Sequence, residues 1–263
     1  MANHYNTNLF HLPNRTSKPR SNGVTMVMDK GISIRQAEDF INTSSDYVDF
    51  VKLGFGTSLI SKNVKEKVKL YKDAGMKVYV GGTLFEAFVI RNQFEDYVKY
   101  IAELGMDCAE VSDGSIDISH EKKCEYISIL SKNYTVLSEV GSKEEGVIIH
   151  PARWIKMMQS ELDAGSSKVI AEARESGTVG IFHKNGSAHT LLINRIVNKI
   201  KLENIIWETP QKSQQVYFLK LFGCNVNLGN IGVEDVIPLE TLRIGLRGDT
   251  FFSFLPEALK QPL

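Results

Sequence analysis

The chain has 263 residues, of which 43% are hydrophobic, and its 31 Lys and Arg residues balance 31 Asp and Glu residues. This length and composition suit one large α/β domain with a sizeable core. A net charge of zero lacks the basic excess typical of proteins that act on nucleic acids or membrane surfaces, so we expect neither as a partner. The three cysteines are far apart and form no CxxC or Cys/His cluster, which gives no indication of a disulfide framework or a structural zinc site.

The first 22 residues are polar and contain basic residues and two prolines. We expect residues 1–22 to form a flexible N-terminal arm ahead of a single domain over residues 23–263. The arm lacks the apolar core of a signal peptide, and no run of about 18 apolar residues follows it. A cytoplasmic protein without membrane spans is the expectation.

Eight apolar, β-favouring runs alternate along the chain with stretches of helical periodicity. Strands are expected at residues 24–28, 48–53, 77–80, 108–112, 135–140, 168–172, 205–208 and 224–228. Helices are expected at residues 33–42, 64–74, 93–104, 119–130, 153–163, 190–200, 211–221 and 239–246. A strand–helix unit needs roughly 30 residues, which this spacing supplies. The pattern predicts an α/β fold of the closed (β/α)8 TIM-barrel type; an open doubly wound sheet is the alternative, but no GxGxxG follows the first strand.

Local signals support these boundaries. Ser119 is placed to cap one helix, and Pro151 suits a first helical position. Gly75, Gly105 and Gly165 follow three predicted helices, where glycine supplies the left-handed conformation of a C-cap.

Polar residues mark the ends of the predicted strands. They are Asp29, Lys52, Gly81, Glu110, Glu139, Glu172, Glu208 and Asn227. In such barrels the active site lies at the C-terminal ends of the strands, so these side chains are expected to converge. Like charges at one mouth are costly unless a cation balances them. Hard oxygen ligands beside a phosphate- or carboxylate-bearing substrate favour Mg²⁺.

The stretch from Ile205 to Gln215 reads as a strand, a polar turn and a helix N-terminus. Such a turn directs backbone N–H groups at an anion, and Lys212 adds a cation there. The alternative is an ordinary strand–helix connection. Lys143, shortly after Glu139, could give or take a proton beside a carbanion, or could be a solvated lysine in a charged loop.

Seven runs in this order together resemble the phosphosulfolactate synthases. They are Met28–Gly31, Asp49–Ser58, Gly81–Glu86, Glu110–Ser115, Glu172–Gly177, Pro210–Gln215 and Leu246–Phe251. The resemblance extends from about Gly23 to Phe251, and the set is specific although each run alone is weak. It implies a Mg²⁺-dependent lyase on a (β/α)8 barrel that adds sulfite to phosphoenolpyruvate, giving (2R)-phospho-3-sulfolactate. That family serves coenzyme M synthesis in methanogenic archaea and sulfolactate formation in some bacteria, and it includes plant heat-stress proteins.

The resemblance also implies roles for particular residues. Lys143 matches the family's proposed general acid, and the metal ligands are expected among Glu110, Glu139 and Glu172. Candidates for the phosphate are Lys212, Gly229, Asn230 and Arg247, and candidates for sulfite are Lys52 and Arg174.

The chain departs from the family pattern near the expected acid. Ser142 stands before Lys143 where two lysines are usual, and the following loop is short. Ala173 replaces a common glycine, and Val80 a common proline. The alternatives are therefore a homologue acting on a different phosphorylated acid or nucleophile, and a non-catalytic stress-related protein on the same barrel. Exposed barrel helices often pair, which leaves a homo-oligomer open.

Overall fold

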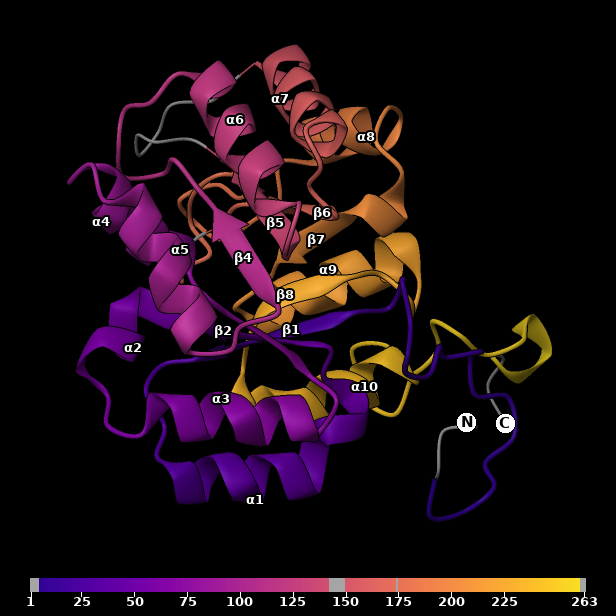
Figure 1. Cartoon of the computed structure of the whole chain (residues 1–263). Helices are drawn as coiled ribbons and strands as arrows, with labels where there is room; N and C mark the ends of the chain where they lie inside the picture. The colour runs from indigo at the N-terminus through magenta and orange to yellow at the C-terminus, as the bar shows by residue number, and fades with distance from the viewer. Residues whose placement is uncertain (1–4, 142–149, 174, 261–263) are drawn as a thin grey trace.

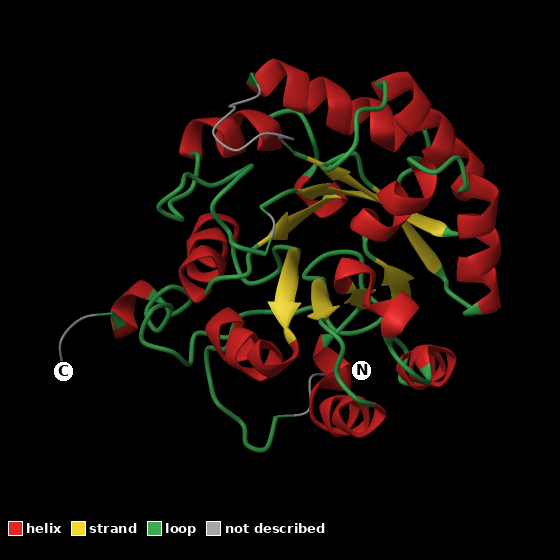
Figure 2. Ribbon diagram, turned by 90° about the vertical axis from the view of Figure 1, so that its left-hand side faces the viewer, coloured by secondary structure: helices red, strands yellow, loops and turns green. Residues whose placement is uncertain are grey.

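The computed structural model describes residues 5–141, 150–173 and 175–260. Eight parallel strands form one sheet in the order β3-β2-β1-β8-β7-β6-β5-β4. The strands are β1 (Thr25–Asp29), β2 (Phe50–Leu53), β3 (Lys77–Val80), β4 (Cys108–Val111), β5 (Thr135–Val140), β6 (Lys168–Ala171), β7 (Ile205–Glu208) and β8 (Leu228–Gly232). The two end strands, β3 and β4, face each other, so the sheet curls into a nearly closed barrel (Figure 2). The predicted (β/α)8 fold is confirmed.

The helices surround this barrel (Figure 1). They are α1 (Ile34–Ser44), α2 (Thr57–Ile60), α3 (Val64–Asp73), α4 (Gly82–Val89), α5 (Phe94–Glu103), α6 (His120–Leu130), α7 (Pro151–Asp163), α8 (Thr190–Val197), α9 (Lys212–Phe222) and α10 (Val236–Arg243). Short 3-10 turns are η1 (Ser45–Tyr47), η2 (Gly54–Gly56), η3 (Leu202–Asn204), η4 (Val233–Asp235) and η5 (Glu257–Leu259). The predicted caps are confirmed: the Ser119 side chain accepts from Lys122 N, and Pro151 opens α7. No helix in the described part of the chain is long and apolar enough to cross a membrane.

The core has two layers because side chains alternate along each strand. One set fills the barrel interior: Val24, Met26, Phe50, Tyr79, Cys108, Leu137, Ile170 and Ile206. The other set points outward and packs against the helices. The interior set closes the lower part of the barrel and forms the floor beneath the mouth.

The last strand differs from the prediction. It is β8, Leu228–Gly232, and not residues 224–228. Asn227 therefore lies at the base of the barrel, where its side chain accepts from Val24 N at 3.0 Å and donates to Glu203 O at 3.0 Å. The register of β8 against β1 shifts between Thr25 and Val27, as in a β-bulge. This strand is difficult to predict from residue propensities because it contains two glycines and a bulge.

Two further features of the structure differ from the prediction. Helix α4 was not predicted, because its start, Gly81-Gly82, reads as a loop. The carboxylate of Asp29 does not join the mouth: it accepts from Tyr71 Oη at 3.0 Å and pairs with Lys67 Nζ at 2.7 Å on α3. Met28 is the β1 side chain at the mouth, because neighbouring strand residues face opposite sides.

The described part of the N-terminal arm contacts the base of the barrel. Arg15 Nε lies 2.9 Å from Glu240 Oε1 on α10, and Arg20 Nε lies 3.0 Å from Asp49 Oδ1. Lys18 Nζ donates to Ser45 O at 3.0 Å. These contacts place residues 15–20 beneath the strands.

Candidate active site

A layer of charged side chains lies directly above the apolar interior of the barrel. On five strands the charged residue follows an interior apolar residue by two positions, so both point inward and the second lies nearer the mouth. The charged residues are Lys52, Glu110, Glu139, Glu172 and Glu208. Strand alternation therefore gathers one cation and four carboxylates at the C-terminal end of the barrel, as the sequence predicts.

Lys52 is the centre of this layer. Its Nζ lies 3.1 Å from Glu110 Oε2, 3.4 Å from Glu208 Oε1 and 3.5 Å from Glu139 Oε2. Burial by itself lowers the pKa of Lys52, but the three carboxylates raise it well above its usual value. Lys52 is therefore held as a cation among these carboxylates.

Two of the carboxylates are fully enclosed. Burial, with the neighbouring Glu139 and Glu208 charges, raises the pKa of Glu110 to about 7, although Lys52 opposes the rise. Burial likewise raises the pKa of Glu208. Glu110 Oε1 accepts from Gly82 N at 2.5 Å, and Glu208 Oε2 accepts from Ala173 N at 2.9 Å. These carboxylates therefore hold the start of α4 and the loop after β6 against the lysine.

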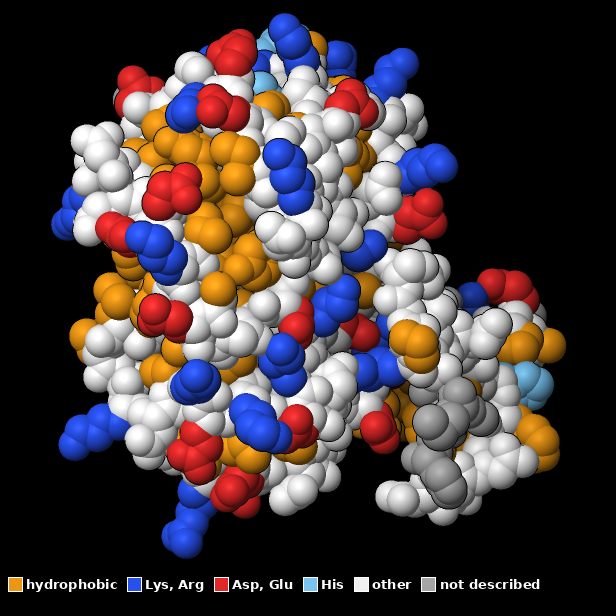
Figure 3. Space-filling view, viewed as in Figure 1, with side chains coloured by type: hydrophobic (Ala, Val, Ile, Leu, Met, Phe, Trp, Pro, Cys, Tyr) orange, Lys and Arg blue, Asp and Glu red, His pale blue; other side chains and the backbone are white. Residues whose placement is uncertain are grey.

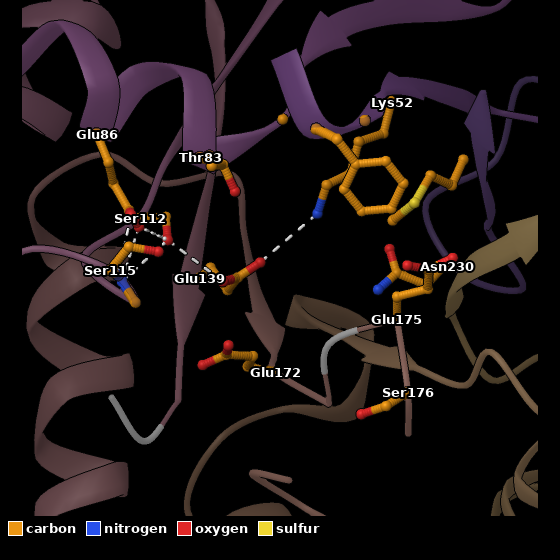
Figure 4. A pocket seen from close by; sticks show the side chains of 16 residues that line it. Lys52, Thr83, Glu86, Ser112, Ser115, Glu139, Glu172, Glu175, Ser176 and Asn230 are labelled. Atoms are coloured by element: carbon orange, nitrogen blue, oxygen red, sulfur yellow. Dashed lines mark hydrogen bonds and ion pairs between the residues drawn. The ribbon is translucent and has the colours of Figure 1, made fainter. Parts of the chain in front are cut away.

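The other two, Glu139 and Glu172, line a cavity of about 400 Å³ at the mouth. Figure 4 shows both carboxylates facing this space, with Lys52 reaching towards Glu139. A Cβ at Gly141 would overlap Oε2 of Glu172, so this glycine leaves the room that the carboxylate occupies. The cavity thus presents two carboxylates and one ammonium group close together.

Glu86 on α4 is a lining residue that the sequence analysis missed. Its side chain is buried, and it accepts from Ser112 Oγ at 2.6 Å, Gly114 N at 2.7 Å and Ser115 N at 2.9 Å. It therefore fixes the loop after β4. A carboxylate inside the apolar run Leu84–Val89 was the available signal.

Asn230 also reaches the cavity, through an unusual backbone. Its φ is 56°, a left-handed conformation that Asn tolerates better than most residues. Its Oδ1 is buried and has no hydrogen-bond partner among the described residues. Gly229 lies deeper: a Cβ there would come 2.6 Å from Met26 Cε. The bulge in β8 therefore presents the amide of Asn230, whereas Gly229 allows close packing inside the barrel.

The remaining predicted residues lie elsewhere. Lys212 is half exposed at the start of α9 and pairs with Asp249 at 2.5 Å. Neither Lys212 nor Arg247 is among the described residues that line the cavity. Lys143 and Arg174 fall outside the described residues.

Within the described ranges, no group of three or more His, Cys, Asp or Glu side chains is arranged to hold a metal ion. Glu139 and Glu172 nonetheless supply hard oxygen donors to one cavity, which is the ligand chemistry that Mg²⁺ prefers. A parallel barrel with an acidic, lysine-containing cavity at the C-terminal ends of its strands has the architecture of a barrel enzyme.

Comparison with known proteins identifies the family to which the chain belongs. The family model for (2R)-phospho-3-sulfolactate synthase (ComA) matches residues 13–249. The chain is 43% identical over 247 residues to the phosphosulfolactate synthase of Methanothermobacter thermautotrophicus, covering 92% of this chain and 96% of that protein. It is 40% identical over 244 residues to the phosphosulfolactate synthase of Bacillus subtilis, covering 92% and 97%. The chain therefore belongs to the (2R)-phospho-3-sulfolactate synthase family, a family of lyases.

A solved structure supports the fold alone. The 3-hexulose-6-phosphate synthase from Salmonella typhimurium superposes with a TM-score of 0.53 at 16% sequence identity, covering 85% of this chain and 100% of that chain. This likeness agrees with the barrel architecture and carries no inference about substrate.

Proposed function

We propose that the chain catalyses the Mg²⁺-dependent addition of sulfite to phosphoenolpyruvate, giving (2R)-phospho-3-sulfolactate. Membership of the family supports this reaction. The observation that carries it is the pair of carboxylates, Glu139 and Glu172, in the same cavity as the fixed cation Lys52. A cavity of about 400 Å³ accommodates a small phosphorylated acid together with sulfite.

In this proposal Glu139 and Glu172 hold Mg²⁺. Glu110, the third predicted ligand, acts indirectly, because it contacts Lys52 and Gly82 N and does not line the cavity. Bound Mg²⁺ would supply a Lewis acid for the negative charge that develops on the substrate carboxylate. Ser112 Oγ lies 2.6 Å from Glu86 Oε1, to which it donates its single proton, and 3.2 Å from Glu139 Oε1, so the hydroxyl helps to fix the position of the Glu139 carboxylate.

The chain's own residues attract and orient the reactants. The sulfur lone pair of sulfite forms a bond to C3 of phosphoenolpyruvate, and the electrons of the C2–C3 double bond move onto C2 and the carboxylate. Lys52, which lines the cavity, and Arg174, two residues after Glu172 in the sequence, are proposed to draw sulfite to this position. Asn230, which lines the cavity, is proposed to receive the phosphate, and Lys212 and Arg247 are proposed to attract it from outside the cavity.

A proton must then reach C2 to complete the addition. Lys52 is unsuited to donate it because its pKa is raised well above its usual value. Lys143, two residues after Gly141 at the end of β5, is proposed as this acid. The free amine that remains would regain its proton from solvent before the next turnover.

The reaction can be tested directly by ³¹P NMR of the purified protein with phosphoenolpyruvate, sulfite and Mg²⁺. We expect a new phosphate-ester signal that requires sulfite and disappears with EDTA. Glu172→Gln should lose the signal, whereas Glu125→Gln, an exposed carboxylate on α6, should retain it. A folded, Mg²⁺-binding protein that gives no sulfite-dependent signal would refute the proposal and favour another nucleophile, another acid or a non-catalytic role.

A further inference from the structure

A second cavity, of about 510 Å³, lies at the opposite end of the barrel. We call it the basal cavity; residues 18–21 of the N-terminal arm line it together with the beginnings of β2, β3, β5 and β6. The interior apolar residues separate it from the mouth. It is therefore distinct from the site described above.

The basal cavity is strongly basic. Four cationic side chains line it, from Lys18, Arg20, Lys77 and Lys168, against the single carboxylate of Asp49. Arg20 Nε lies 3.0 Å from both oxygens of Asp49, and Thr25 N also donates to this carboxylate at 2.9 Å. In the space-filling view, several Lys and Arg side chains, with Asp and Glu side chains among them, lie near the centre of the face where the arm meets the barrel (Figure 3).

The three lysines have neutral partners among the described residues. Lys168 Nζ donates to Ser21 O at 2.8 Å and to Glu203 O at 2.6 Å. Lys18 Nζ donates to Ser45 O, and Lys77 Nζ donates to Thr135 Oγ1 at 3.1 Å. Carbonyl and hydroxyl oxygens satisfy N–H groups but do not neutralise the positive charge.

This arrangement has an energetic cost that an anion would relieve. Lys168 is only 8% exposed, and the side chain of Arg20 is only 2% exposed. Arg20 Nη2 is buried and has no hydrogen-bond partner among the described residues. Burial lowers the pKa of Lys18 and of Lys168, although the negative charge of Asp49 opposes this change in both. An anion in the cavity would supply the charge balance that these neutral oxygen partners do not provide.

We propose that the basal cavity binds a small, multiply charged anion carrying phosphate or carboxylate groups. The ammonium groups of Lys18, Lys77 and Lys168 provide the balancing charge, and the guanidinium of Arg20 adds to it from the wall of the cavity. Because Lys18 and Arg20 belong to the arm and Lys168 begins β6, the bound anion joins the arm to the barrel. The site is independent of the proposed catalytic reaction.

The proposal can be tested by calorimetric titration and thermal unfolding with inorganic phosphate, pyrophosphate and citrate, each against chloride at equal ionic strength. We expect at least one of the three anions to bind saturably and to raise the midpoint of unfolding. Saturation by phosphate or pyrophosphate alone would assign a phosphate site, and saturation by citrate would extend it to carboxylates. Absence of saturation by all three would overturn the proposal.

Variants locate the binding. Lys168→Met should raise the dissociation constant of the anion at least about tenfold, because it removes a charge-assisted hydrogen bond. Because Lys168→Met also removes the hydrogen bonds to Ser21 O and Glu203 O, the effect of the anion is measured against the midpoint of the same variant in chloride. Lys69→Met, which alters a lysine 75% exposed on α3, should bind like the parent. Glu172→Gln at the mouth should also retain the effect; loss of the effect in Glu172→Gln but not in Lys168→Met would place the anion at the mouth and refute the proposal.

Discussion

Replacing Lys52 by Met removes the cation at the centre of the mouth while keeping an unbranched side chain of similar length. Three carboxylates then lose a partner that lies 3.1 to 3.5 Å away. Glu110 and Glu208 are almost completely buried, so water cannot replace the lysine. Breaking a buried pair by removing one partner costs about 3–5 kcal/mol, and we expect Lys52→Met to lower the free energy of unfolding by that amount near pH 8.

The loss of stability in Lys52→Met should increase as the pH rises. In the parent protein the pKa of Glu110 is about 7, above its ordinary value of 4.5. Between these values the folded state keeps a proton that the unfolded state has released, so this group's contribution to stability falls as pH rises. Without Lys52, the charge that opposes this rise is gone and the Glu110 pKa moves higher. The deficit of Lys52→Met should therefore widen above pH 7 and narrow as pH falls towards 5.

Urea unfolding followed by circular dichroism, from about pH 5 to about pH 9, measures this difference. The double variant Lys52→Met/Glu110→Gln should recover at least about half of the loss, because one of the unpaired buried charges is gone. Lys69→Met provides a surface control. A deficit that is independent of pH, or that Glu110→Gln does not reduce, would show that packing and not charge explains the role of Lys52.

Three further substitutions test the mouth. Gly141→Ala should displace the Glu172 carboxylate that its Cβ would overlap, raising the Mg²⁺ concentration needed for half-maximal turnover at least about tenfold; an unchanged Mg²⁺ dependence would refute this placement. Glu86→Gln keeps the shape of the side chain but replaces one acceptor oxygen with a donor beside backbone N–H groups. We therefore expect kcat/KM to fall roughly 10- to 100-fold, with the secondary structure unchanged by circular dichroism. Normal kinetics would show that the hydrogen bond from Ser115 N to Glu86 does not position the loop for catalysis. Lys143→Ala should abolish turnover in a folded protein, and retained turnover would remove Lys143 as the acid.

Strand alternation explains how much of the site could be predicted from sequence. On five strands the β-favouring run ends in a charged residue two positions after an interior apolar one, and this placed Lys52, Glu110, Glu139, Glu172 and Glu208 at one mouth. The same rule explains the error at Asp29, since a shift of one residue moves a side chain to the opposite face. The prediction of side-chain direction was therefore reliable only where the strand end was correct to the residue.

The features that the sequence did not predict involve glycine-containing segments or pairs of residues that are far apart in the sequence. Strand β8 contains Gly229, Asn230 and Gly232, which have poor strand propensity, so the apolar residues before it were taken for the strand. Glycine at the start of α4 hid that helix and with it Glu86. The pairing of Lys52 with Glu110 was not predictable, because it requires the angular order of strands that are far apart in sequence.

The two ends of the barrel have opposite charge, and the apolar interior explains why each must be balanced separately. Among the described residues, the lining of the mouth cavity contains Lys52 and the four glutamates Glu86, Glu139, Glu172 and Glu175, whereas the lining of the basal cavity contains four cations and Asp49. A layer of apolar side chains lies between them. Residues held at fixed positions on opposite sides of this layer cannot form ion pairs with one another, so neither excess neutralises the other locally. The mouth therefore favours a cation such as Mg²⁺, and the base favours an anion. It follows that EDTA should leave anion binding at the base unchanged, and that a basal anion should stabilise the fold even in the absence of Mg²⁺.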